Sequence, residues 1–102
     1  MIIVQAKAIP KNKAASYKIV AYAENLIKNT KLEDGNLSYN LYMSTQDDSL
    51  MFIELWDDMD SLQLHLNTAH FNKFGDDIKD LLSEELIMEV YNEVLNNYNL
   101  KI

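Results

Sequence analysis

The chain has 102 residues, 48% of them hydrophobic and 25% charged, with only two glycines and one proline. One domain spanning residues 1–102 fits this length, and the composition is typical of globular proteins and excludes collagen-like and disordered classes. The net charge is −7 and all nine basic residues are lysines. We therefore expect neither a nucleic acid nor an anionic membrane as a partner, because both are bound through cationic patches.

The sequence contains no cysteine, which excludes disulfides, thiolate metal sites and a cysteine nucleophile. Its first residues lack the basic segment and the long apolar stretch of a signal peptide, and no window approaches the roughly 18 apolar residues of a membrane span. We therefore expect a cytoplasmic protein.

The first half of the chain predicts a strand, a helix and a second strand. Residues 2–9 form a β-rich run that Pro10 ends. Residues 12–30 repeat apolar side chains every three or four positions, which predicts a helix with one buried face. The Asp34-Gly35 pair predicts a turn, and residues 37–43 alternate apolar and polar side chains, as a strand does.

The second half predicts a strand, two helical segments and a last strand. The polar stretch 45–49 is a hairpin-length loop, so residues 50–56 should pair antiparallel with the strand before them. Asp57 and Asp58 suit the start of a helix that ends near Leu66, and a second helical run follows a bend near Thr68. Residues 85–95 predict a fourth strand, with a helix as the alternative. This order describes an α+β, ferredoxin-like split βαβ domain with helices on one face of an antiparallel sheet.

The strand 50–56 is apolar on both faces. One face carries Met51, Ile53 and Leu55, and the other carries Phe52 and Trp56. A monomer rarely exposes so large an apolar surface, so we expect a homodimer in which one face of the sheet packs against a second copy, and we assign Phe52 to that interface.

Two histidines, His65 and His70, are the candidate acid/base groups, because only histidine exchanges a proton near neutral pH without a perturbed pKa. A purely structural role is the alternative for both. Glu54 lies in an apolar strand and is the carboxylate that could join them at a metal. The five-residue offset of the histidines spans the predicted bend, so they do not share a helical face. We therefore expect no metal site.

Aromatic side chains cluster around these histidines in the sequence. Trp56, Phe71 and Phe74 could line a pocket for a flat aromatic ligand, although any core would use them as well. The chain has no glycine-rich phosphate loop and no dinucleotide fingerprint, so we expect no organic cofactor.

The segment ELWDDMDSLQLHLNTAHFNKF resembles the signature of the antibiotic biosynthesis monooxygenase family, and within that family it is most similar to small quinol monooxygenases. The signature has Glu-x-Trp, an acidic turn, a leucine three residues before a histidine, and a second histidine followed by an aromatic residue. The matching positions are Glu54, Trp56, Leu62, His65, His70 and Phe71. Two departures are Ala69, where many relatives have proline, and the lack of arginine.

The resemblance implies a dimeric α+β barrel with a pocket between sheet and helices in each subunit. It also implies oxidation of a quinol or phenolic aromatic small molecule by O2 without a metal or an organic cofactor. In this reading His65 and His70 are catalytic, with His65 the preferred base. The substrate-binding residues would be Trp56, Phe71, Phe74 and Glu54.

Three other readings differ in their chemistry. A related branch isomerises a phosphorylated signalling sugar derivative, for which Lys7 or Lys73 could hold the phosphate. Haem degradation, found in the same superfamily, is disfavoured because the first strand has no asparagine and His65 stands where those enzymes have tryptophan. A small-molecule-binding, stress-response dimer without turnover is the non-enzymatic alternative.

Overall fold

The computed structural model describes residues 1–92. The elements follow the order predicted from the sequence and confirm the α+β, ferredoxin-like fold. They are β1 (Ile2–Ala8), α1 (Lys13–Thr30), β2 (Asn36–Met43), β3 (Leu50–Trp56), α2 (Met59–Leu66), α3 (Ala69–Ile78), a short 3-10 helix η1 (Lys79–Leu81) and β4 (Ile87–Asn92). The alternative of a helix in the last segment is wrong for residues 87–92, and the predicted end of that strand, residues 93–95, lies outside the described residues.

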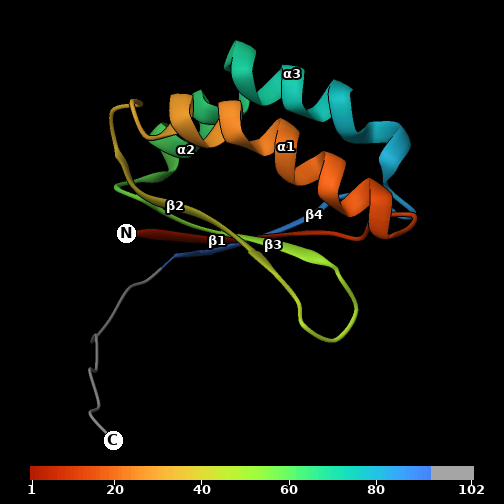
Figure 1. Ribbon diagram of the computed structural model, residues 1–102. Helices are drawn as coiled ribbons and strands as arrows, with labels where there is room; N and C mark the ends of the chain where they lie inside the picture. Colours follow the sequence, from red (N-terminus) through yellow and green to blue (C-terminus); the bar gives the residue numbers. More distant parts are fainter. Residues whose placement is uncertain (93–102) are drawn as a thin grey trace, which may run out of the picture.

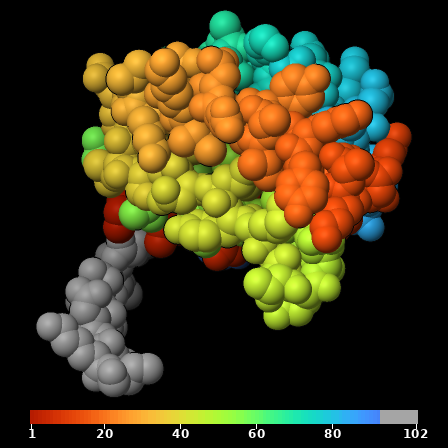
Figure 2. All heavy atoms as spheres, in the orientation of Figure 1, coloured from red at the N-terminus to blue at the C-terminus, as the bar shows by residue number. Residues whose placement is uncertain are grey.

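The four strands form one antiparallel sheet in the order β2-β3-β1-β4. The three α-helices cover one face of this sheet, and the loop between β2 and β3 projects on the opposite side (Figures 1 and 2). The central pair, β1 and β3, aligns Val4 with Glu54 and Ile2 with Trp56. This register places the Glu-x-Trp pair on the face that the helices cover.

Each α-helix begins at a side chain that caps its free backbone amides. Asn12 accepts from the amide of Ala15 at the start of α1, and Asp58 accepts from the amide of Ser61 at the start of α2. Thr68, at the predicted bend, caps α3 by accepting from the amide of Phe71. These caps fix where each of the three helices begins.

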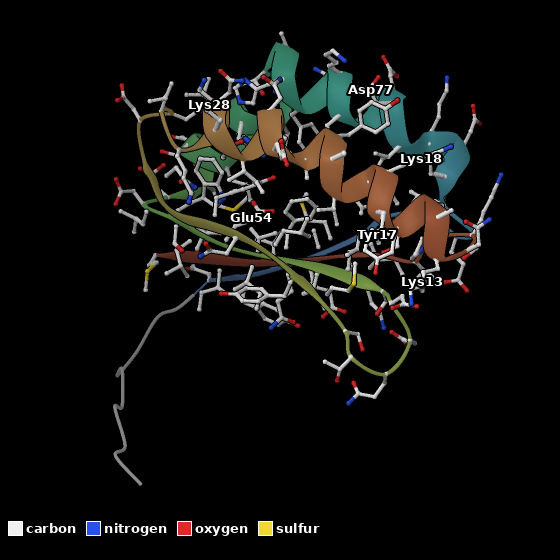
Figure 3. All side chains as sticks on the ribbon, viewed as in Figure 1. Lys13, Tyr17, Lys18, Lys28, Glu54 and Asp77 are labelled. Carbon is white, nitrogen blue, oxygen red and sulfur yellow. The ribbon has the colours of Figure 1, made fainter. Side chains whose placement is uncertain are left out.

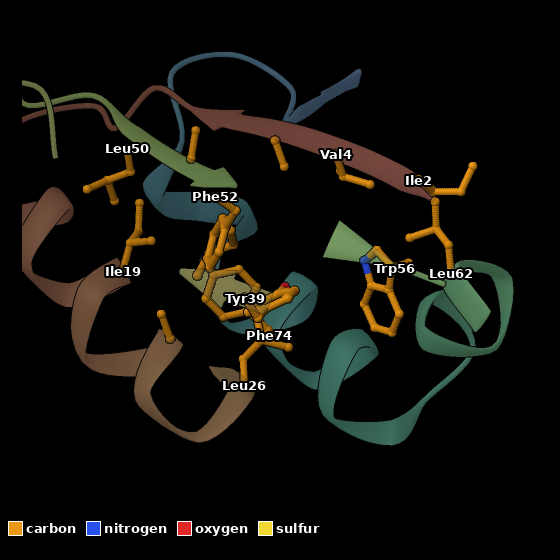
Figure 4. Close-up of a cluster of buried hydrophobic side chains, with 14 residues drawn as sticks. Ile2, Val4, Ile19, Leu26, Tyr39, Leu50, Phe52, Trp56, Leu62 and Phe74 are labelled. Atoms are coloured by element: carbon orange, nitrogen blue, oxygen red, sulfur yellow. The ribbon is translucent and has the colours of Figure 1, made fainter. Parts of the chain in front are cut away.

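The core fills the space between the sheet and the helices. Tyr39 and Phe52 from the sheet meet Phe74 from α3, with ring centroids 5.5 and 5.7 Å apart in the two contacts of Phe52 (Figure 4). Trp56 is fully buried near Leu62 of α2 (Figure 4). Phe52 therefore belongs to the core, and its assignment to a dimer interface is wrong.

The opposite face of the sheet carries the other parity of each strand and has no helix over it (Figures 1 and 3). Ile53 is 38% exposed there. The strand register sets seven apolar side chains on this outer face, namely Ile3, Tyr42, Met51, Ile53, Leu55, Ile87 and Tyr91. The strand 50–56 is apolar on both faces, as predicted. However, the face that carries Ile53 is the uncovered one, and the face that carries Phe52 is buried.

Within residues 1–92, no helix combines the length and the apolarity that crossing a bilayer requires.

Substituting Gly35 tests how closely the turn after α1 fits against α2. Gly35 has a φ of 81°, and a Cβ atom there would lie 2.1 Å from Oγ and 2.6 Å from Cβ of Ser61. We expect Gly35→Ala to lower the free energy of unfolding by about 2 kcal/mol or more, measured by urea denaturation. Gly75→Ala is the matched control, since a Cβ at this helical position meets nothing within 4 Å, and it should stabilise by about 0.5–1 kcal/mol. A Gly35→Ala protein as stable as the wild type would contradict this packing.

Candidate active site

Both predicted histidines contact one carboxylate that the sequence did not indicate. Glu33 lies in the turn between α1 and β2, and its Oε2 atom is 2.7 Å from Nδ1 of His65 and 2.7 Å from Nε2 of His70. His65 comes from the last turn of α2 and His70 from the first turn of α3. As their spacing predicted, the histidines do not share a helical face, but the short connection at Thr68 between α2 and α3 leaves both rings in contact with the same carboxylate.

The hydrogen bonds to Glu33 determine which ring nitrogens carry protons. A carboxylate only accepts, so Nδ1 of His65 and Nε2 of His70 are the N–H donors. This leaves Nε2 of His65 with a lone pair, 3.5 Å from the hydroxyl of Tyr39. Burial lowers the pKa of His65, although its hydrogen bond with Glu33 acts in the opposite direction. His65 is thereby favoured as a neutral imidazole with one available lone pair.

Aromatic rings surround the imidazole of His65. The ring centroids of Trp56, Phe71 and Tyr39 lie 4.8, 5.0 and 5.4 Å from that of His65. The side chain of His65 is fully buried, whereas those of His70 and Glu33 are 18% and 14% exposed. Within residues 1–92, the cluster is therefore exposed to solvent only on the side of His70 and Glu33.

Glu54 does not contact the histidines, so it is not the carboxylate that could join them at a metal, as the sequence had suggested. Its side chain points from β3 into the layer between sheet and helices (Figure 3). One carboxylate oxygen accepts from Nε1 of Trp56 at 3.0 Å. Burial raises the pKa of Glu54 to about 7, while the bond from Trp56 opposes this shift and the charge of Glu33 adds to it. Glu54 is thus a buried carboxyl that titrates near neutral pH.

Tyr39 completes the buried polar cluster and was not predicted as a site residue. Burial raises its pKa, and the charges of Glu54 and Glu33 act in the same direction. Its hydroxyl therefore stays protonated and can donate to the lone pair of His65. In the sequence, Tyr39 reads as one of several strand tyrosines and Glu33 as a surface charge in a turn, so neither carries a local signal.

Two of the predicted aromatic residues line a cavity of about 370 Å³ between α3 and the segment that leads to β4. Phe71 and Phe74 form part of its largely apolar wall, together with Ile78, Leu82 and Leu86. Trp56 and Glu54 do not reach it, because they are buried in the core. Phe71 faces the cavity and also packs against His65, so it separates the cavity from the histidine cluster.

His70 opens onto a smaller cleft of about 150 Å³ between α1 and α3, which Phe74 also borders. Lys73 lies in the same cleft, and its Nζ donates to Asp77 at 2.7 Å. Lys7 is on the outer face of the sheet, opposite Met51 and away from the histidines. Neither lysine is thus placed as an unpaired cation beside the histidines, as a phosphorylated substrate would require.

Comparison with known proteins places these features in a family. The sequence model of antibiotic biosynthesis monooxygenases matches residues 1–77. The chain is 30% identical over 89 residues to YcnE of Bacillus subtilis, which is named as a proposed monooxygenase. This alignment covers 84% of the chain and 90% of YcnE. An uncharacterised Synechocystis protein, sll1783, is 29% identical over 75 residues; this alignment covers 72% of the chain but only 51% of sll1783. The chain therefore spans about half the length of that relative.

The fold is shared with solved structures across most of the chain. Rv0793 from Mycobacterium tuberculosis superposes with a TM-score of 0.86 at 24% identity, covering 95% of this chain and 98% of that one. At this identity the likeness establishes the common fold.

The pKa of Glu54 predicts a pH-dependent stability. An acid whose pKa rises on folding, here from 4.5 to about 7, binds more protons in the folded state, so the wild type loses stability as pH rises between these values. Glu54→Gln keeps an oxygen that can accept from Trp56 and carries no charge. We expect its stability relative to the wild type to rise by roughly 3 kcal/mol between about pH 4 and about pH 8, measured by urea denaturation. Glu24→Gln, exposed on α1, is the matched control. Parallel pH profiles for Glu54→Gln and the wild type would contradict the assignment.

Proposed function

Because the chain belongs to the antibiotic biosynthesis monooxygenase family, we propose that it oxidises a quinol or phenolic aromatic small molecule with O2, without a metal or an organic cofactor. The observation that supports this most directly is the hydrogen-bonded His65–Glu33–His70 cluster, which lies one aromatic side chain away from an apolar cavity. The cavity volume falls in the range of small-molecule sites.

The chemistry asks little of the protein. A hydroquinone that loses its phenolic proton becomes electron-rich enough to reduce O2. One oxygen atom enters the ring and the other leaves as water, so hydroquinone and O2 give a hydroxyquinone and water, and the substrate supplies all four electrons. The protein needs to bind the ring, accept a proton and exclude bulk water.

The residues of the cluster divide this work. His70 is partly exposed and is the histidine that a substrate reaches first. His65 holds a lone pair at Nε2, where the phenolic hydroxyl of Tyr39 already lies, and a substrate hydroxyl would present the same group. Glu33 fixes the tautomers of both rings and stabilises whichever becomes charged. In this proposal Phe71 and Phe74 hold the ring, and their displacement joins the cavity to the histidines. Trp56 and Glu54 shape the inner wall behind His65.

Histidine variants test the proton-acceptor role. In an oxygen-electrode assay with a panel of quinols and phenols, His70→Ala and His65→Ala should each lower the turnover rate about 100-fold or more, since a positioned base contributes 10² to 10⁴. If His65 is the base, the rate rises with pH through a value below the usual 6.5, because burial lowers its pKa. Gln63→Ala, on the exposed surface of α2, is the control and should keep full activity.

Two outcomes would count against this function. Wild-type oxygen uptake by the His65→Ala, His70→Ala double variant would remove the acid/base role. Saturable binding of aromatic ligands with no oxygen uptake for any substrate in the panel would support the non-catalytic, small-molecule-binding alternative instead.

We also propose that the chain forms a homodimer through the outer face of its sheet. The apolar row described above, including Ile53, has no covering element in residues 1–92. Self-association through such a face removes apolar surface from water.

Charged substitutions on two different surfaces test the dimer. The wild type should scatter light as a particle of about twice 11.8 kDa. Ile53→Asp should give a monomer or aggregates, because it would bury a carboxylate at the interface. Leu64→Asp is the matched control, since Leu64 is 70% exposed on α2, and it should remain dimeric. A wild type with the mass of one chain at low micromolar concentration would overturn the proposal.

A further inference from the structure

We propose that Glu33, His65 and His70 form a binding site for a divalent zinc ion. Two imidazole nitrogens and one carboxylate oxygen are a ligand set that Zn²⁺ accepts, with a water molecule in the fourth position. In this chain the set is contributed by three separate segments, the turn after α1, the end of α2 and the start of α3. None of the expectations from sequence spacing included Glu33 as a ligand.

The distances require only a small closure of the site. The three candidate ligand atoms all lie within 4.8 Å of one another, and Oε2 of Glu33 is 2.7 Å from each histidine nitrogen. In a tetrahedral zinc site, bonds of about 2.0–2.1 Å place ligand atoms about 3.3 Å apart. Binding therefore moves the carboxylate slightly out from between the two rings and draws the rings together. His70, in the first turn of α3 and partly exposed, is the side chain best able to make this movement.

The protons on the histidines can be accommodated when the metal binds. Zinc needs the lone pair of Nδ1 of His65, so the ring proton must move to Nε2. Nε2 faces the hydroxyl of Tyr39 at 3.5 Å, and that hydroxyl can accept as well as donate. Tyr39 thus offers the outer partner that a metal-bound imidazole normally has. For His70, the proton moves to Nδ1.

The surroundings favour a cation at this position. The chain carries a net charge of −7, which attracts cations at long range. The side chains of His70 and Glu33 are partly exposed, which gives the ion and a water ligand access from solvent. The enclosed ring of His65 is held by its aromatic neighbours, so one ligand is already fixed before the metal arrives.

Metal binding and the proposed oxidation compete for the same nitrogen lone pairs. A histidine that coordinates zinc cannot accept a proton from a substrate, so zinc should inhibit the reaction. Zinc binding does not depend on the oxidation and can be measured without any substrate. A negative result for one proposal therefore leaves the other intact.

The test uses untagged protein freed of metal with a chelator. Titration calorimetry with Zn²⁺ should give one ion per chain, and Co²⁺, as a spectroscopic substitute, should give the visible absorption bands of a low-coordinate site. Glu33→Gln and His70→Ala should each weaken Zn²⁺ binding by at least roughly 100-fold, since loss of even an outer partner costs 10- to 100-fold. Both positions are partly exposed, and circular dichroism checks that the variants remain folded.

Glu24→Gln is the matched control for the loss of one carboxylate and should bind Zn²⁺ as the wild type does. Equal Zn²⁺ affinity in the wild type, Glu33→Gln and His70→Ala would overturn the site and indicate adventitious binding to surface carboxylates. The absence of any Zn²⁺ heat and any Co²⁺ band in the wild type at millimolar metal would overturn it as well.

Discussion

One carboxylate oxygen joins the ends of the three α-helices, and the candidate site depends on it. Oε2 of Glu33 accepts from His65 at the end of α2 and from His70 at the start of α3, while Glu33 itself follows the last turn of α1. Without this acceptor, two imidazole N–H groups would lose their partner in a largely buried position, which is costly. The same two contacts set the tautomers and so decide which nitrogen can react.

The sheet imposes the second constraint, because side chains alternate between its two faces. On β3 the inward parity supplies Phe52 to the core and Glu54 and Trp56 to the site, while the outward parity supplies an apolar surface centred on Ile53. A change of register by one residue would exchange these roles completely. The site and the proposed dimer surface therefore both depend on the same strand alignment. A shift of β3 that changed one of them would also change the other.

Local patterns predicted the fold well because each element carries its own signal. The cap at Asp58, the bend at Thr68 and the alternation of residues 37–43 are visible in the sequence, and these signals do not depend on tertiary contacts. The face assignment of Phe52 failed because both parities of β3 are apolar, so the strand alone does not reveal which side the helices cover. Glu33 was missed for a related reason. It is 32 residues from His65 in sequence, and nothing in its turn distinguishes a site carboxylate from a solvated one.

The residues that matched the family signature are separated along the chain but form one continuous series of contacts. Glu54 accepts from Trp56, the indole of Trp56 packs on His65, and Glu33 links His65 to His70. The two-residue spacing of Glu54 and Trp56 follows from the strand period, and the spacing to the histidines follows from the lengths of α2 and its connection to α3. Each interval in the signature thus has a geometric cause. The one member that lies outside the signature, Glu33, is also the one that connects its two histidines.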